Sequence, residues 1–302
     1  MASDLPYYYG EESGSRKYLE SLVPLIILVL IAVVLVGKTT NVFCEVPGLN
    51  AALCNNGGTI KIAVIGSLEE TGKSGATVVN APELRALLDG ELGRACNMQY
   101  QVFNPDDLTY VQSSLLRNYD LLVLAGDRMY TRPVRTAVET YLEEGGKVII
   151  IGDAATKDPE DALYNGWGHI KVPIELRRTA SMDSTEIPVL QLSDPVLKIV
   201  DLNNPINVGY GLKLNLTKIE DKPTCSGDLK VIDINPLAGG TISILTGENK
   251  ETGTTSTVPA VVEQKGIMGG SVYYFSLDPG CIPNMWISTV QEITGKQTCH
   301  LQ

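Results

Sequence analysis

The sequence predicts a doubly wound α/β fold for residues 59–302, and three observations support this prediction. Short apolar runs alternate with amphipathic stretches, as in parallel sheets whose strands are connected by helices. From Lys171 to Val262 the runs are β-branched and separated by Pro, Gly, Asn and Thr clusters, which favours β-hairpins. A last apolar run and helix then return the chain to the sheet, so residues 171–262 form a β-rich insertion.

The strands of the core are the apolar runs between turn residues. We expect them at Ile60–Ile65, Met98–Phe103, Asp120–Ala125, Lys147–Ile151 and, late in the chain, Ser271–Leu277. The expected helices are Ala81–Leu92, which Asn80 and Pro82 open, Asp106–Arg117, Pro133–Glu144, which a Gly-Gly pair stops, and Pro283–Ile293.

One segment near the N-terminus is apolar enough to cross a membrane. Leu22 to Gly37 is 16 residues long, just short of the roughly 17 to 25 that span a bilayer as a helix, and Ser21 or Tyr18 can extend it. We therefore expect a mobile tail at 1–20, a transmembrane helix at 21–38 in the lipid bilayer, and a membrane-proximal stalk at 39–58.

Two other interpretations of this segment remain open. A cleavable signal peptide needs small residues after its apolar core, whereas Val36 to Thr40 offers a poor cleavage site. An archaeal pilin-type leader would use Gly14, but Arg16 and Lys17 follow this glycine instead of preceding it. Both patterns fit less well than an uncleaved signal anchor.

The cysteines favour an extracytoplasmic domain at the cell membrane. Basic residues on the two sides of the helix barely favour an N-terminus inside, but all six cysteines follow it. An even number on one side is typical of an oxidising compartment. Cys44 and Cys54 flank a short loop and are the expected disulfide, and Asn215 begins a glycosylation sequon. Buried unpaired cysteines are the alternative.

The acidic composition argues against polyanionic partners. The net charge of -11 argues against binding to nucleic acid or to anionic membrane surfaces.

A glycine-rich loop after the first strand resembles a phosphate-binding loop but departs from it. Five residues separate Gly66 from Gly72-Lys73, whereas a P-loop has four, so that its N–H groups converge on one phosphate. The expected helix begins only near Ala81, and two glutamates inside the loop would repel an anion. We expect an ordinary crossover loop and no cofactor.

Four phrases in order resemble the class I glutamine amidotransferase-like superfamily, in its trehalose-utilisation-protein-like branch. They are IKIAVIG, YDLLVLAGD, YLEEGGKVIIIGD and GGSVYYFSLDPG. The resemblance implies a flavodoxin-like parallel sheet and a cysteine nucleophile on the turn after Lys147–Ile151. Ala154 stands at that place and cannot attack a carbonyl. The resemblance therefore implies a non-catalytic member of the superfamily.

Topology predicts where a site would lie. In open α/β sheets ligands bind beyond the carboxyl ends of the strands, at the switch in strand order. The polar residues expected at this rim are Ser67, Thr71, Lys73, Asp127, Arg128, Tyr130, Asp153, Thr156 and Asp278. No His, Cys or Asp spacing identifies a metal site, and turns and helix caps are the simpler use of these residues.

Three functions follow from these observations. The favoured one is a single-pass membrane protein with a catalytically inactive extracytoplasmic domain that binds a surface protein or glycan. The second is a structural subunit of a surface filament or membrane complex. The third is an extracellular hydrolase that uses Asp127, Asp153 and Asp278.

Overall fold

The computed structural model describes most of the chain after residue 57. The longer described ranges are 58–69, 75–105, 113–167, 186–201, 228–237, 240–267 and 270–296. Shorter described pieces are residues 24, 27–28, 31, 108, 174–178, 182–183, 203–207, 213–215 and 225. The chain divides into two units, residues 1–57 and residues 58–302.

In the first unit the described residues are Pro24, Ile27, Leu28 and Ile31, which are helical and exposed. The rest of the predicted membrane helix at 21–38, and the predicted Cys44–Cys54 pair, lie outside the described residues. Within the described part of the chain, no helix has both the length and the apolar character that a membrane span requires.

The second unit is built on a parallel sheet. Its strands are β1 (Ile60–Gly66), β2 (Met98–Phe103), β3 (Leu121–Ala125), β4 (Lys147–Ile151) and β14 (Gly270–Phe275). They lie in the order β2-β1-β3-β4-β14, and every neighbouring pair is parallel. This is the flavodoxin-like strand order, in which the direction of winding reverses between β1 and β3. The predicted fold class is confirmed for this part of the chain.

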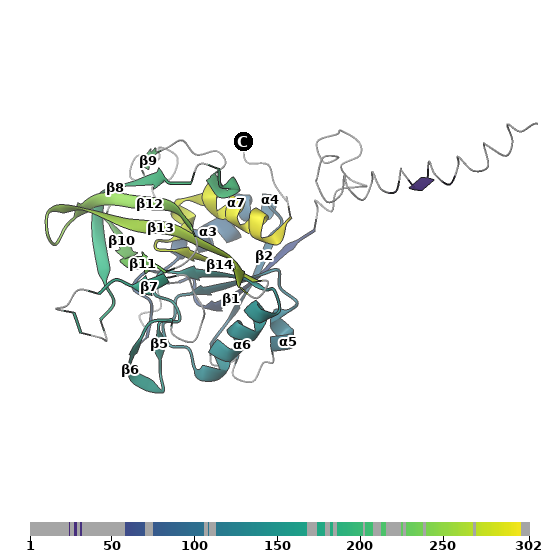
Figure 1. Ribbon diagram of the computed structural model, residues 1–302, viewed down its shortest axis with the longest axis horizontal. Coiled ribbons are helices and arrows are strands. Elements are labelled where there is room, and N and C mark those ends of the chain that lie inside the picture. Colours follow the sequence, from purple (N-terminus) through teal and green to yellow (C-terminus); the bar gives the residue numbers. More distant parts are fainter. Residues whose placement is uncertain are drawn as a thin grey trace, which may run out of the picture. The chain divides into compact units, whose positions relative to one another are not determined.

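Helices cover both faces of these strands (Figure 1). On one side lie α3 (Pro82–Asp89), α4 (Glu91–Ala95) and α7 (Pro283–Thr294), and on the other α5 (Ser113–Leu116) and α6 (Arg132–Glu143). The helix predicted at Ala81–Leu92 is two helices, because the backbone of Gly90 is extended. Of the helix predicted at Asp106–Arg117, the structure describes α5 and a single 3₁₀ residue, Leu108.

The β-rich section joins the same sheet. Its strands are β7 (Ile174–Leu176), β8 (Val189–Ile199), β9 (Lys213–Asn215), β10 (Leu229–Ile232), β11 (Ile234–Pro236), β12 (Gly240–Asn249) and β13 (Thr254–Ile267). β13 pairs antiparallel with β14, and β12, β8 and β10 follow outward, which makes one ten-stranded sheet with β9 attached to β8. β12 and β13 form an antiparallel hairpin of the predicted kind, and this hairpin extends the core sheet.

Smaller elements complete the unit. β5 (Lys157–Asp158) pairs with β6 (Asp161–Asn165), β11 pairs with β7, and 3₁₀ turns lie at η3 (Pro205–Asn207) and η5 (Pro279–Cys281). Cys281 in η5 is disulfide-bonded to Cys225, 56 residues earlier, with a Cα–Cα distance of 5.6 Å. Cys96 is also disulfide-bonded.

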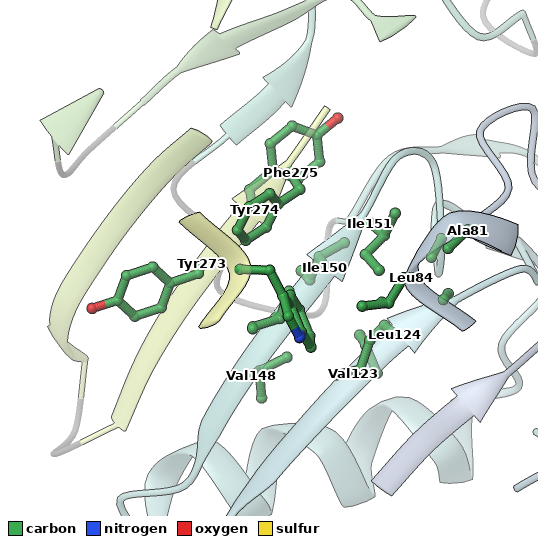
Figure 2. Packing of buried hydrophobic residues seen from close by; sticks show 14 of the residues in the cluster. Ala81, Leu84, Val123, Leu124, Val148, Ile150, Ile151, Tyr273, Tyr274 and Phe275 are labelled. Atoms are coloured by element: carbon green, nitrogen blue, oxygen red, sulfur yellow. The ribbon is translucent and has the colours of Figure 1, made fainter. Parts of the chain in front are cut away.

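The core lies between the central strands and their helices. Every residue of β3 and β14 is buried, as expected for parallel strands that are covered on both faces. Figure 2 shows Leu124 and Ile151 of β3 and β4 beneath Ala81 and Leu84 at the start of α3. On the same side of the sheet, the Trp286 ring of α7 packs edge to face against Phe275 of β14, with ring centroids 6.2 Å apart.

Candidate functional site

The switch point between β1 and β3 is filled by the protein's own backbone. Gly66 ends β1 and Gly126 follows β3, with φ of 107° and 70°, a region that favours glycine. A Cβ on Gly126 would lie 1.9 Å from the carbonyl oxygen of Ser67, so the two loops are in direct contact. Thr77 N–H donates to the Gly126 carbonyl at 3.3 Å, and Arg128 N–H donates to that of Gly75 at 2.8 Å. Residues 75–77 therefore lie over the crevice in which ligands of such folds bind.

Asp153 is buried and holds the same crossover segment. One of its carboxylate oxygens accepts the N–H groups of Val78 at 2.8 Å and Val79 at 3.3 Å. The other lies 3.3 Å from Arg128 Nε, and the Asp153 side chain is fully buried. Burial raises the pKa of Asp153, and the Arg128 cation and the two N–H groups counteract this effect in part. This geometry makes Asp153 a tether for residues 78–79.

Asp278 does the same for the start of α3. Its carboxylate accepts N–H bonds from Glu83 at 2.8 Å and Leu84 at 3.0 Å, which are two of the first N–H groups of the helix. It also accepts the N–H of Gly280 at 2.8 Å within its own turn. Burial raises the pKa of Asp278 to about 6 against these three hydrogen bonds. A residue 194 positions away in the sequence thus caps α3.

The other predicted rim residues that are described make local turns. Ser67 Oγ accepts the N–H of Glu69 at 3.0 Å, and Asp127 Oδ1 accepts that of Met129 at 2.8 Å. Thr156 is buried, and its hydroxyl donates to the Asp153 carbonyl at 2.7 Å. Lys73 lies outside the described residues. Ligand binding by these rim residues stays a prediction. Asn215, the predicted glycosylation site, lies in β9, and its glycosylation also stays a prediction.

Tyr130 is hydrogen-bonded to the carboxyl end of β1. Its side chain is fully buried, and its hydroxyl donates to the Ile65 carbonyl at 2.6 Å. Burial, followed by the Asp127 charge, raises the pKa of Tyr130 well above its ordinary value. This tyrosine therefore fixes the end of β1 and stays protonated.

The turn after β4 has a buried alanine where the resemblance implies a cysteine nucleophile. Gly152 and Ala155 have φ of 57° and 60°, so the turn is sharp, but β5 follows it instead of a helix. A nucleophile elbow needs a strand-to-helix turn that exposes its side chain, whereas Ala154 is buried. The indole N–H of Trp167 donates to the Ala154 carbonyl at 2.9 Å, which fixes this turn.

A polar cluster beside this turn was not expected from the sequence. Tyr274 and Ser276 lie on one face at the end of β14, and both side-chain oxygens are buried without a hydrogen-bond partner in the described part of the chain. Burial, followed by the charges of Asp153 and Asp233, raises the pKa of Tyr274 well above its ordinary value. Asp233 pairs with Arg177 at 3.4 Å. The sequence indicated this cluster only by the spacing of Tyr274 and Ser276, which are two positions apart in the apolar run SVYYFS and so share one face of the strand.

Two hollows lie away from this rim. The amino-end pocket, of about 650 Å³, lies at the amino ends of β3 and β4. It is lined by Arg117, Tyr119, Asp120, Tyr141, Glu144 and Lys147, and by Gly145, Gly146, Ile293 and Thr294. The helical groove, of about 700 Å³, lies along α3 and α4, with a more apolar lining that includes Ala86, Leu87, Leu92 and Ala95. Among the described residues, no group of three or more His, Cys, Asp or Glu side chains is arranged to hold a metal ion.

Comparison with known proteins gives a result at the level of the fold. No protein-family model and no curated protein sequence matches the chain. A ThuA-like protein from Bacteroides uniformis is similar in structure, with a TM-score of 0.51 and 12% identity over 79% of this chain and 92% of that one. A ThuA-like protein from Parabacteroides merdae gives 0.50 and 16% over 81% and 93%.

β-Galactosidases are among the similar structures as well. The enzyme from Bacillus circulans gives a TM-score of 0.48 and 13% identity, over 82% of this chain and 33% of that one. The chain spans about a third of the length of the β-galactosidases it matches. At identities this low, structural similarity shows the fold alone. The parallel sheet, its strand order and the two ThuA-like structures together show that residues 58–302 have a ThuA-like fold.

Proposed function

We propose that this chain is a single-pass membrane protein that displays a catalytically inactive, amidotransferase-like binding domain outside the cytoplasm. Its partner would be a molecule of the cell surface. The observation that carries the location is the Cys225–Cys281 disulfide, because such bonds persist mainly in oxidising compartments. The apolar stretch at 21–38 supports the anchor by its composition.

The carboxyl ends of the strands support binding over catalysis. Asp153 and Asp278 are buried, and each accepts at least two N–H groups of residues 78–84. A general acid or base must reach the proton that it transfers, and these carboxylates face backbone amides. Ala154 supplies no nucleophile at the turn after β4.

The exposed edge of the sheet favours one alternative, a structural subunit of a surface assembly. β2 is the last strand on its side of the sheet, and Val102 in it is 47% exposed. An edge strand presents unpaired N–H and C=O groups to another chain. Sedimentation of the full-length protein, with and without residues 1–38, would separate this function from that of a monomeric binding protein.

Labelling in native membranes tests the main proposal. Intact cells that express the full-length chain are treated with a membrane-impermeant protease and, separately, with an alkylating reagent before and after reduction. We expect the protease to cleave the domain from outside, and Cys225 and Cys281 to be alkylated only after reduction. Protection from the protease until the cells are lysed, or alkylation of both cysteines without reduction, would contradict the proposal.

A further inference from the structure

We propose that the helical groove binds a helix of a partner protein, and that this helix has an apolar face flanked by lysine or arginine side chains. This inference rests on the proposed binding function and assigns it a site and a class of partner. The groove has about 700 Å³ and lies along α3 and α4, within the range of volumes of ligand-binding clefts.

The groove is hollow because small residues line it. Ala86 of α3 and Ala95 of α4 are exposed, and Gly90 between the helices and Gly280 of η5 have no side chain. A Cβ on Gly280 would lie 2.1 Å from the backbone of Glu83, so η5 touches α3 directly. Small side chains on a helix surface let the axis of a second helix approach closely.

α3 and α4 have an apolar side besides the one that packs on the sheet. Leu84 of α3 faces the core, next to Leu124 of β3 (Figure 2). Leu87, which is buried, and Leu92, which is half-buried, instead line the groove together with the two alanines. An apolar groove between helices is a common binding site for the apolar face of an amphipathic helix.

Two glutamates give the groove a negative charge. Glu83 and Glu91 both line it, and within the described ranges neither carboxylate forms an ion pair. The arginines of the two helices bond to other groups: Arg85 pairs with two other carboxylates, and Arg94 Nε donates to a backbone carbonyl at 3.2 Å. A cationic partner would therefore neutralise two charges that the described residues leave unpaired.

Glu83 also lies close to another carboxylate. Asp278 accepts the Glu83 N–H at 2.8 Å, and the negative charge of Glu83 adds to the effect of burial in raising the pKa of Asp278. Because Asp278 caps α3, the Glu83 side chain is not needed for that purpose. A lysine or arginine bound beside Glu83 would relieve the repulsion between the two acids.

The charge and the shape of the groove disfavour other occupants. A second copy of the chain, bound through the same surface, would place the same glutamates against each other, and each copy has a net charge of -11. An extended peptide binds best to an open sheet edge, whereas α3, α4 and η5 form this groove. A basic amphipathic helix satisfies both the apolar lining and the two carboxylates.

Peptide binding to the full-length protein tests this assignment. The protein is held in phosphatidylcholine nanodiscs, and empty nanodiscs give the background. The probe is a fluorescein-labelled peptide of about 18 leucine and lysine residues, with leucines at positions i, i+3, i+4 and i+7. One comparison peptide has the same composition in scrambled order, and another has glutamate in place of lysine.

Fluorescence anisotropy measures the affinities. We expect the leucine–lysine peptide to bind with a Kd below about 10 μM and both comparison peptides to bind at least about tenfold more weakly. Its affinity should fall as NaCl is raised from about 50 to about 500 mM, because salt screens its attraction to the two glutamates.

A tryptophan variant locates the binding site. Ala86→Trp fills the groove and should weaken binding of the leucine–lysine peptide by at least about tenfold. The matched control is Thr136→Trp, at an exposed position of α6, which should keep wild-type affinity. Circular dichroism and thermal unfolding confirm that both variants are folded.

A pair of double variants separates the groove from the general acidity of the chain. Glu83→Gln combined with Glu91→Gln removes both charges of the groove and should weaken binding by about fivefold or more. Glu248→Gln combined with Glu251→Gln removes the same number of charges at exposed positions of the β12–β13 hairpin, and should leave the affinity unchanged.

Several results would overturn the helix-binding site. They are equal binding of the scrambled or the glutamate peptide, wild-type affinity of Ala86→Trp, equal losses in the two double variants, and no binding of the leucine–lysine peptide by the folded protein. The proposed location of the domain would still stand if the protease and alkylation results support it, so the two proposals fail separately.

Discussion

Substitution of Asp278 by asparagine should change how the stability of the domain depends on pH. Burial raises the pKa of this carboxyl to about 6 in the folded protein, from an ordinary value of 3.8. Between these two pH values the folded state holds a proton that the unfolded state has released. The free energy of unfolding therefore falls as pH rises through this window.

The magnitude follows from the difference between the two pKa values. It corresponds to about 3 kcal/mol that Asp278 contributes at about pH 4 and loses by about pH 7. Asparagine has no such proton, so the stability of Asp278→Asn relative to wild type should rise by about 3 kcal/mol over the same range. At about pH 4 the variant should be less stable by about 1 to 3 kcal/mol, because an amide NH₂ replaces one acceptor of the three N–H groups.

Urea unfolding at several pH values measures this difference, with the fluorescence of the buried Trp167 and Trp286 as the signal. Asp201→Asn is the control, because this aspartate is exposed and accepts one N–H in a turn. Its curve should run parallel to that of wild type. A difference between Asp278→Asn and wild type that does not change with pH would refute the reasoning about burial.

Three further predictions concern the closed end of the sheet. Gly126→Ala should destabilise the domain by more than about 3 kcal/mol, because the added Cβ meets the Ser67 carbonyl oxygen. Gly253→Ala, at a similar φ of 65° in open space, should cost only about 1 to 2 kcal/mol, and equal losses in urea unfolding would contradict the contact. Cys225→Ser should lower the free energy of unfolding by about 4 kcal/mol relative to oxidised wild type, and equal stability of the two proteins under oxidising conditions would mean that the bond constrains the unfolded chain little. Ala154→Cys should release no ammonia from glutamine, since the turn lacks a following helix, and measurable turnover would show that only the thiol was missing.

Local sequence patterns predicted the core elements well. Met98–Phe103 and Lys147–Ile151 are strands with the predicted bounds, because each is an apolar run between turn residues. The break in the helix after Asp89 was missed, since apolar residues continue at helical spacing through Gly90 to Leu92. That β13 would pair with β14 depends on contacts between strands, which a local pattern does not contain.

The site was harder to predict for the same reason. The sequence placed Asp153 and Asp278 after strands, where the structure has them. The N–H groups that donate to these carboxylates belong to Val78, 75 positions from Asp153, and to Leu84, 194 positions from Asp278. The local sequence therefore could not show that the two carboxylates are buried and bonded to another segment. The Gly145–Gly146 pair was recognised as a helix stop, but the close approach of Gly146 to the Tyr141 ring depends on the tertiary structure.

The pairing of β13 with β14 has a consequence for how the domain can be shortened. β14 is buried along its whole length, and β13 occupies the side of it that faces away from β4. Excision of residues 171–262 would remove most of β13. β14 would then be an apolar edge strand with unpaired N–H and C=O groups, and such edge strands pair with other chains. A minimal flavodoxin-like version of this protein would therefore aggregate, and any truncated form intended for crystallisation must retain the hairpin β12–β13.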